Sequence, residues 1–203
     1  MTTLRRGSAL DHHPLLRSES DVAARADGGA VTLTPRHPLA LLQVSAFAGD
    51  IDDAGNRLSR ETRLPLPLPL RLTGSASKSL RAIGPGIWHV AGEPDQIPDA
   101  DALRTTLGGV ATVVDLSHAR TVLHVSGPSA ARVIAGHCGI DLDAVMFPTG
   151  ALTGTRFNQL GMTLARLDDT PTFELMVFRG YAAFVYESLV ESAREFNVNA
   201  VRT

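Results

Sequence analysis

The stretch RTVLHVSGPSAARVIA, residues 120–135, changes from the pattern of a strand to that of a helix within a few residues. Two sets of side chains alternate along 120–125, and this period of two is typical of a half-buried strand. The tripeptide SGP at 126–128 follows at once, and proline is favoured at the first positions of a helix. The stretch therefore predicts a strand that leads directly into a helix ending near Gly136.

The sequence on both sides of this stretch indicates further short strands. Runs of apolar and β-branched residues that end at glycine or at turn-forming polar residues are typical of strands. Such runs occur at 39–44, 87–90, 110–116, 155–160, 162–167 and 172–178, and a short helix is expected at 101–107. Together with a helix at the end of the chain, this order predicts an α+β fold, an antiparallel sheet with helices packed on one face.

The last helix is expected over 181–196, because apolar residues recur there with helical spacing. Its predicted apolar stripe consists of Tyr181, Phe184, Val185, Leu189, Ala193 and Phe196. We expect residues from about 110 to 196 to form one unit, in which this helix and the helix at Pro128 cover the same face of the sheet.

The N-terminal part of the chain has a different character. Residues 1–30 show no sustained period of 2.0 or 3.6, so the sequence predicts an extended N-terminal segment over 1–35 and a single α+β domain over 36–203. Such a segment buries too little apolar surface to offset its ordering entropy alone. Two interpretations stay open: it is disordered, or it lies over another surface.

Composition narrows the class of protein. The 203 residues carry a formal net charge of −2, which gives no electrostatic reason to bind nucleic acid or an anionic membrane. No apolar run approaches the ~20 residues of a membrane span. One cysteine, Cys138, excludes an internal disulfide. We expect a cytoplasmic protein with no nucleic-acid and no membrane partner.

The segment LPLPLPL at 64–70 places proline at every second position. Proline removes the backbone donors that a central strand needs, so the segment is a connector or an edge. One interpretation is a loop tucked against its own domain, and the other is an arm whose leucines pack on a partner chain. The predicted interface residues of that arm are Leu64, Leu66, Leu68 and Leu70.

Motifs for chemistry are weak throughout. Gly84 and Gly86 supply two of the three glycines of a dinucleotide site, and strand-like sequence follows them. The chain has a single lysine, Lys78, outside any phosphate-binding loop. Ser129 stands at a strand-to-helix turn after Gly127, but alanine replaces the second glycine of a nucleophile elbow and proline precedes the serine, and the histidines have no metal-ligand spacing. The sequence therefore predicts no catalytic, no cofactor-binding and no metal-binding residue.

One block of short motifs is similar to a known family. The segments VDLSHAR at 114–120 and LHVSGP at 123–128 resemble the aminomethyltransferase-type, folate-binding fold and, more narrowly, the gamma subunit of heterotetrameric sarcosine oxidase. Further matches follow in the family's order: DL at 141–142, FPTG at 147–150, RLD at 166–168, FELMV at 173–177 and Arg179, with LRAIGP at 80–85 and Trp88 upstream.

The resemblance implies a subunit without catalytic residues of its own, which assembles with alpha, beta and delta subunits and stabilises their complex. FAD, FMN, NAD and tetrahydrofolate are implied in those partners. The complex would oxidatively demethylate sarcosine or a related N-methyl amine to glycine, with folate accepting the one-carbon unit. The alternatives are a stand-alone folate-binding or aminomethyltransferase-like protein, and a regulatory or scaffold domain of unrelated origin.

Overall fold

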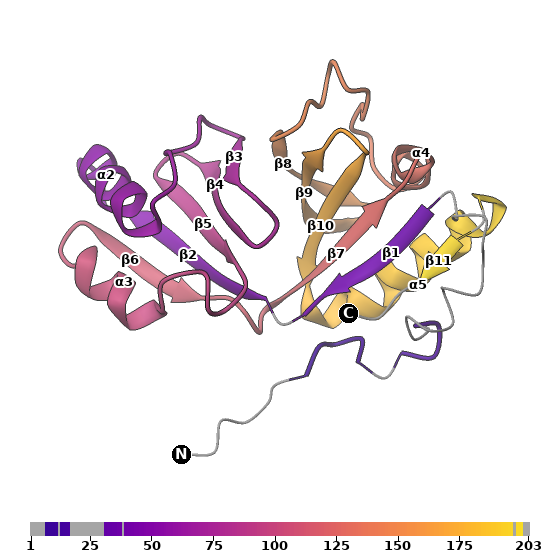
Figure 1. The fold of residues 1–203 in the computed structure, drawn as a ribbon, viewed down its shortest axis with the longest axis horizontal. Helices are drawn as coiled ribbons and strands as arrows, with labels where there is room; N and C mark the ends of the chain where they lie inside the picture. Colours follow the sequence, from indigo (N-terminus) through magenta and orange to yellow (C-terminus); the bar gives the residue numbers. More distant parts are fainter. Residues whose placement is uncertain (1–6, 12, 17–30, 38, 197, 201–203) are drawn as a thin grey trace.

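Two β-sheets lie side by side in the computed structural model, and helices cover the outer face of each (Figure 1). The structure describes residues 7–11, 13–16, 31–37, 39–196 and 198–200. The chain passes from one sheet to the other between β1 and β2 and again between β6 and β7, so the five-stranded sheet is one continuous stretch of sequence, and the six-stranded sheet combines β1 with the strands that follow that stretch.

The six-stranded sheet has the order β11-β1-β7-β10-β9-β8. Its neighbours pair antiparallel, except that β11 runs parallel to β1. Two helices cover its outer face, and their buried side chains share one apolar core with the strands. The elements are β1 (Val31–Arg36), β7 (Arg120–Ser126), α4 (Ala130–Ala135), β8 (Leu152–Phe157), β9 (Leu160–Asp168), β10 (Thr172–Phe178), α5 (Ala182–Ala193) with short 3₁₀ turns at Arg179–Tyr181 and Arg194–Phe196, and β11 (Val198–Ala200).

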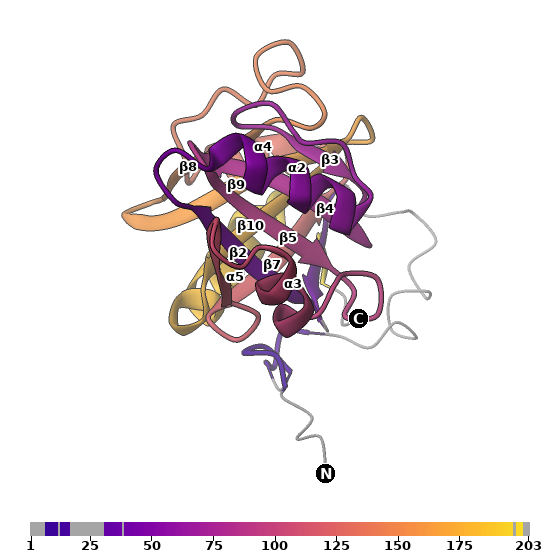
Figure 2. The same cartoon turned by 90° about the vertical axis from the view of Figure 1, so that its left-hand side faces the viewer.

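The five-stranded sheet has the order β3-β4-β5-β2-β6, and all of its pairs are antiparallel. Two helices lie over its outer face, as Figure 2 shows, and enclose a second apolar core around Trp88. The elements are β2 (Ala40–Ala46), α2 (Ile51–Thr62), β3 (Leu72–Gly74), β4 (Lys78–Gly84), β5 (Ile87–Gly92), α3 (Ala100–Thr106) and β6 (Ala111–Asp115).

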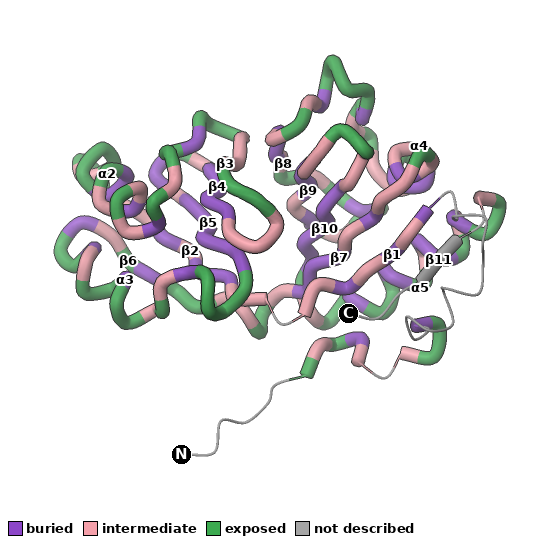
Figure 3. The backbone as a smooth tube through the Cα atoms, in the orientation of Figure 1, coloured by how far each residue is buried: buried purple, intermediate pink, exposed green. Residues whose placement is uncertain are grey.

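The central strands of both sheets are buried on two faces (Figure 3). Along β7, Leu123 and Val125 belong to the core under the helices, whereas Val122 belongs to a small cluster between the sheets. Leu41 and Ala91 of the other sheet complete this cluster together with Met176. Alternate side chains of a strand point to opposite faces, so the predicted alternation along 120–125 separates these two environments.

The α+β class with antiparallel sheets is confirmed, but the structure has two sheets where the sequence predicted one. The predicted unit from about 110 to 196 is wrong at its beginning, because β6 pairs with β2 in the five-stranded sheet. The predicted boundary after residue 35 falls inside β1, which pairs with β7 within the six-stranded sheet.

The predicted stripe on the last helix is right at Val185, Leu189 and Ala193 and wrong at its first two aromatic residues. Leu189 is fully buried as expected, but Tyr181 is 48% and Phe184 49% exposed. The buried face of α5 consists of Ala182, Val185, Tyr186, Leu189, Val190 and Ala193. The prediction gave weight to the large aromatic side chains of Tyr181 and Phe184, whereas Ala182 and Tyr186 face the core beside Val185 and Leu189.

The described part of the N-terminal segment lies over the six-stranded half. Leu10 and Leu16 are buried in its core. The His13 ring meets the Tyr186 ring edge-on, 5.1 Å between centroids, and Gly7 accepts a hydrogen bond from Arg179 at 3.0 Å. Residues 7–11 and 13–16 thus follow the second of the two open interpretations, a segment that lies over another surface.

No helix within the described ranges is long and apolar enough to span a membrane.

Candidate functional site

A buried ion pair joins the two sheets. The Arg81 guanidinium on β4 makes two hydrogen bonds to the Glu174 carboxylate on β10, one from Nη1 to Oε1 and one from Nη2 to Oε2, the latter 3.1 Å. Arg81 is 1% and Glu174 3% exposed. His124 Nε2 on β7 lies 3.2 Å from Oε2, and Arg81 Nε donates to Ser79 Oγ at 3.0 Å. Each charged group therefore has partners in place of water, as buried charges require.

Burial and neighbouring charges together shift the pKa values of the groups in this cluster. Burial alone would raise the pKa of Glu174, but Arg81 and His124 outweigh it and lower the pKa to about 2. His89 on β5 lies nearby, and burial, followed by the positive charges of Arg81 and Arg120, lowers its pKa to about 4. Near neutral pH the site thus holds a carboxylate, a guanidinium and a neutral His89.

The arrangement is suited to holding the sheets together and not to acid–base chemistry. A carboxylic acid with a pKa near 2 carries no proton to donate at neutral pH. Its two oxygens are already occupied by Arg81 and His124. The Ser79 hydroxyl donates to the backbone oxygen of Ala91 at 3.3 Å, so it too is occupied. We therefore interpret the cluster as a structural ion pair that holds the two sheets together.

His137 has structural partners. His137 stacks on Phe157 with 4.3 Å between ring centroids and contacts Ser192 Oγ at 2.8 Å. Cys138 is half-buried beside the same core. Within the described ranges, no group of three histidine, cysteine or acidic side chains is placed to hold a metal. His12 lies outside those ranges.

Ser129 is the N-cap residue of α4, and its hydroxyl makes no capping hydrogen bond.

The proline–leucine segment is anchored to its own domain at both ends. Ser59 Oγ donates to the Leu64 carbonyl at 2.6 Å, and Leu64 packs half-buried against the core around Trp88. At the other end, the Leu70 backbone donates to Ala82 and accepts from Leu152, which belong to different sheets. Between these anchors Leu66, Leu68 and Leu70 are 41%, 75% and 49% exposed. Leu64 thus fits the interpretation of a loop tucked against its own domain, and contact of Leu66, Leu68 and Leu70 with a partner stays a prediction.

Comparison with known proteins identifies the family. A model of the sarcosine oxidase, gamma subunit family matches residues 48–195. The chain belongs to the sarcosine oxidase gamma subunit family. No curated protein is significantly similar to this gamma-family chain in sequence.

Two solved structures share the fold. A chain of heterotetrameric sarcosine oxidase from Corynebacterium sp. U-96, in complex with pyrrole 2-carboxylate, superimposes with a TM-score of 0.79 and 24% identity, over 97% of this chain and 98% of that one. The glycine cleavage system aminomethyltransferase T from Bartonella henselae gives a TM-score of 0.62 and 19% identity, over 85% of this chain and 48% of that one. The gamma-family chain thus spans about half of the aminomethyltransferase.

Some of the motifs that carry the resemblance supply residues for buried contacts of the fold. Arg81 of the LRAIGP segment and Glu174 of the FELMV strand form the inter-sheet ion pair. Phe147 of the FPTG turn is buried, and its carbonyl accepts a hydrogen bond from Arg166 at 3.3 Å. The sequence analysis quoted these segments but missed the pairing, because no local pattern indicates a contact across 93 positions.

Proposed function

We propose that this chain is a non-catalytic subunit that assembles and stabilises a heterotetrameric, sarcosine oxidase-type flavoenzyme. Membership of the gamma subunit family carries the proposal. The agreement over nearly the full length of a chain from a heterotetrameric sarcosine oxidase supports it. The partners in this proposal are an alpha, a beta and a delta subunit, and the complex resides in the cytoplasm.

The chemistry of the complex belongs to those partners in this proposal. FAD, FMN, NAD and tetrahydrofolate bind to the larger chains, which oxidise sarcosine or a related N-methyl amine to glycine and pass the one-carbon unit to folate. The main polar cluster of the gamma-family chain supports a structural role, since both oxygens of Glu174 are engaged within the fold. A scaffold of this kind contributes surface and rigidity.

The proline–leucine segment is the part of the chain that we propose as an interface. Leu68 is 75% exposed although it is a large apolar side chain, and proline residues on both sides restrict the backbone. A preset backbone loses less entropy when it docks, so the exposed leucines can contribute more of their burial to binding.

Affinity purification of the tagged chain from its native host tests the proposal. The expected result is a yellow complex with three other chains and N-methyl amine oxidation, whereas the chain purified alone shows no flavin absorbance. A monomer that retains folate would instead support the stand-alone folate-binding protein, for which the fold shared with an aminomethyltransferase is the supporting observation.

A further inference from the structure

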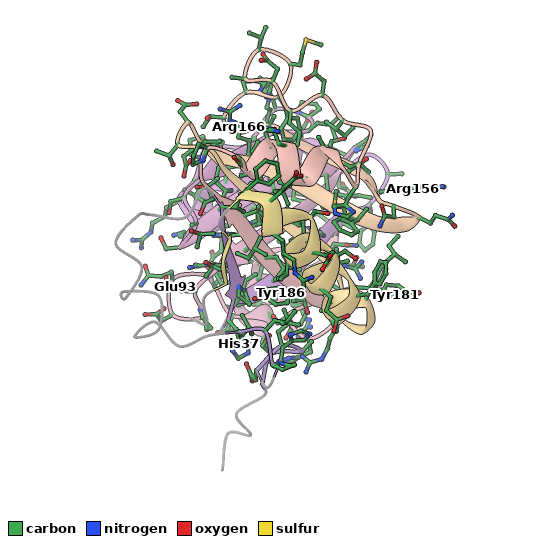
Figure 4. The ribbon with its side chains drawn as sticks, turned by 90° about the vertical axis from the view of Figure 1, so that its right-hand side faces the viewer. His37, Glu93, Arg156, Arg166, Tyr181 and Tyr186 are labelled. Atoms are coloured by element: carbon green, nitrogen blue, oxygen red, sulfur yellow. The ribbon has the colours of Figure 1, made fainter. Side chains whose placement is uncertain are left out.

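Three large aromatic side chains are exposed close together where β10 leads into α5. Phe178, Tyr181 and Phe184 are 50%, 48% and 49% exposed, and they follow one another at intervals of three residues. Side chains three apart on helical turns lie on the same face, so the last two are neighbours on the start of α5. Figure 4 shows Tyr181 projecting away from the ribbon, whereas Tyr186 lies beneath it.

Two arginines that form no ion pair with a described carboxylate border these aromatics. The Arg120 guanidinium lies over the Phe178 ring, 3.5 Å from its centroid, and forms no ion pair with any described residue. Arg156 on β8 is exposed and equally lacks an ion pair within the described ranges. In Figure 4 Arg156 and Tyr181 project from the same flank of the molecule.

A shallow groove connects these groups. Its lining includes Arg120, Arg156, Met162, Met176 and Phe178, and no acidic side chain contributes to it. Burial lowers the pKa of the Arg120 guanidinium, so this side chain has given up part of its hydration without receiving a counter-charge. We define the basic–aromatic surface as this groove together with Tyr181 and Phe184.

The chain as a whole carries a net charge of −2, so this positive surface differs from the average of the molecule. Exposed apolar patches with tyrosine, phenylalanine and arginine are typical of protein interfaces. A guanidinium held over an aromatic ring presents its remaining N–H groups to an incoming carboxylate. A second copy of the chain would bring like charges together on this surface, which disfavours self-association here.

We propose that the basic–aromatic surface binds an acidic segment of a larger subunit, with carboxylates received by Arg120 and Arg156 and apolar side chains packed on Phe178, Tyr181 and Phe184. This inference rests on the proposed function. It adds a second contact region, different in chemistry from the proline–leucine segment and located on the six-stranded half of the molecule.

Charge reversal in the co-expressed complex tests this inference. Arg120→Glu/Arg156→Glu is expected to weaken association with the larger chains at least tenfold at low salt and to reduce the salt dependence of their affinity. The matched control, Arg60→Glu/Arg104→Glu, makes the same charge change on the opposite helices α2 and α3 and is expected to leave affinity within about twofold. Arg120→Gln/Arg156→Gln, which removes charge without reversing it, is expected to give an intermediate loss.

Several results would overturn the inference. Equal affinity and equal salt dependence for the wild type and the glutamate variant, with melting temperatures showing both folded, would exclude the surface as a charged interface. If the glutamate variant fails to fold, the glutamine variant and Tyr181→Ser/Phe184→Ser decide by the same comparison. Binding of a single-stranded RNA oligonucleotide that the variant abolishes, or loss of a homodimer, would assign the surface to another occupant.

The outcome is separable from the proposed function. If the wild-type chain fails to associate with larger subunits, the proposed function itself fails. If the wild type associates and the glutamate variant associates equally well, only this inference fails.

Discussion

Replacing Arg81 by methionine tests how much the ion pair between the sheets contributes to the free energy of unfolding. Arg81 is 1% exposed and makes two hydrogen bonds to Glu174, which is 3% exposed, so water cannot take over the missing partner. His124 would remain as the carboxylate's neighbour. Removing one member of a buried pair costs about 3–5 kcal/mol. For a chain of this size each kcal/mol lowers the melting temperature by about 2–4 °C, so we expect a decrease of about 6–20 °C.

A double variant separates the lost ion pair from the uncompensated charge. Arg81→Met/Glu174→Leu replaces the pair by apolar side chains, and such replacements are often neutral or stabilising. We expect it to unfold in urea within about 2 kcal/mol of the wild type. The control is Arg194→Met, which breaks an ion pair to Glu191 whose side chains are 65% and 67% exposed and which is worth about 0–1 kcal/mol.

The reasoning is refuted if Arg81→Met unfolds at the same urea concentration as the Arg194→Met control. It is also refuted if the double variant loses as much stability as the sum of its single variants, because the charge left behind would then not be the cause.

Three further outcomes follow from the structure. The pKa of His89 falls from 6.5 in the unfolded chain to about 4 in the folded chain, so the unfolded chain binds the proton first as the pH falls. The contribution of His89 to the free energy of unfolding is therefore fully present above pH 6.5, and its loss towards pH 4 lowers that free energy by on the order of 3 kcal/mol. Urea unfolding at pH 7.5 and 4.5 should show a smaller decrease for His89→Gln than for the wild type. Leu189→Ala should cost about 2–5 kcal/mol and Phe184→Ala below about 1 kcal/mol, and equal melting temperatures would contradict the observed face of α5. Leu68→Ser, at the most exposed leucine of the proline–leucine segment, should weaken assembly of the complex without lowering the melting temperature of the free chain; a variant that unfolds alone but assembles normally would assign the segment to its own core.

Local patterns predicted several individual strands and not their partners. The strand expected at 155–160 is wrong, because it spans the end of β8, the turn at 158–159 and the start of β9. The expected strand at 172–178 coincides with β10, and the strand-like sequence after Gly84 and Gly86 forms β5, which pairs with β4. Strand type depends on neighbouring residues, which the sequence displays directly. The assignment of β6 to the other sheet depends on its pairing with β2, about 70 positions away, and periodicity carries no information on that pairing.

Helix α2 shows a second limit of pattern reasoning. Its 12 residues bury Ala54, Gly55, Leu58 and Thr62, so a single large apolar side chain marks its buried face. Gly55 has no side chain because Leu66 of the proline–leucine segment packs against that position, 2.9 Å from where a Cβ would stand. Tertiary packing thus replaced the usual hydrophobic stripe, and no helix was predicted there.

The candidate functional surfaces were predicted unevenly for a similar reason. The proline–leucine segment was recognised because its repeat is contiguous in sequence. The basic–aromatic surface was missed because the predicted frame of the last helix buried Tyr181 and Phe184, and because Arg120 and Phe178 meet only when β7 pairs with β10.

Native mass spectrometry of the complex purified by a tag on a larger subunit tests the central claim most directly. We expect one copy of this chain for each copy of the alpha, beta and delta subunits. We also expect no intact complex when this chain is omitted from co-expression. An intact and fully active amine oxidase that assembles from the other chains alone, with this chain remaining free, would contradict it.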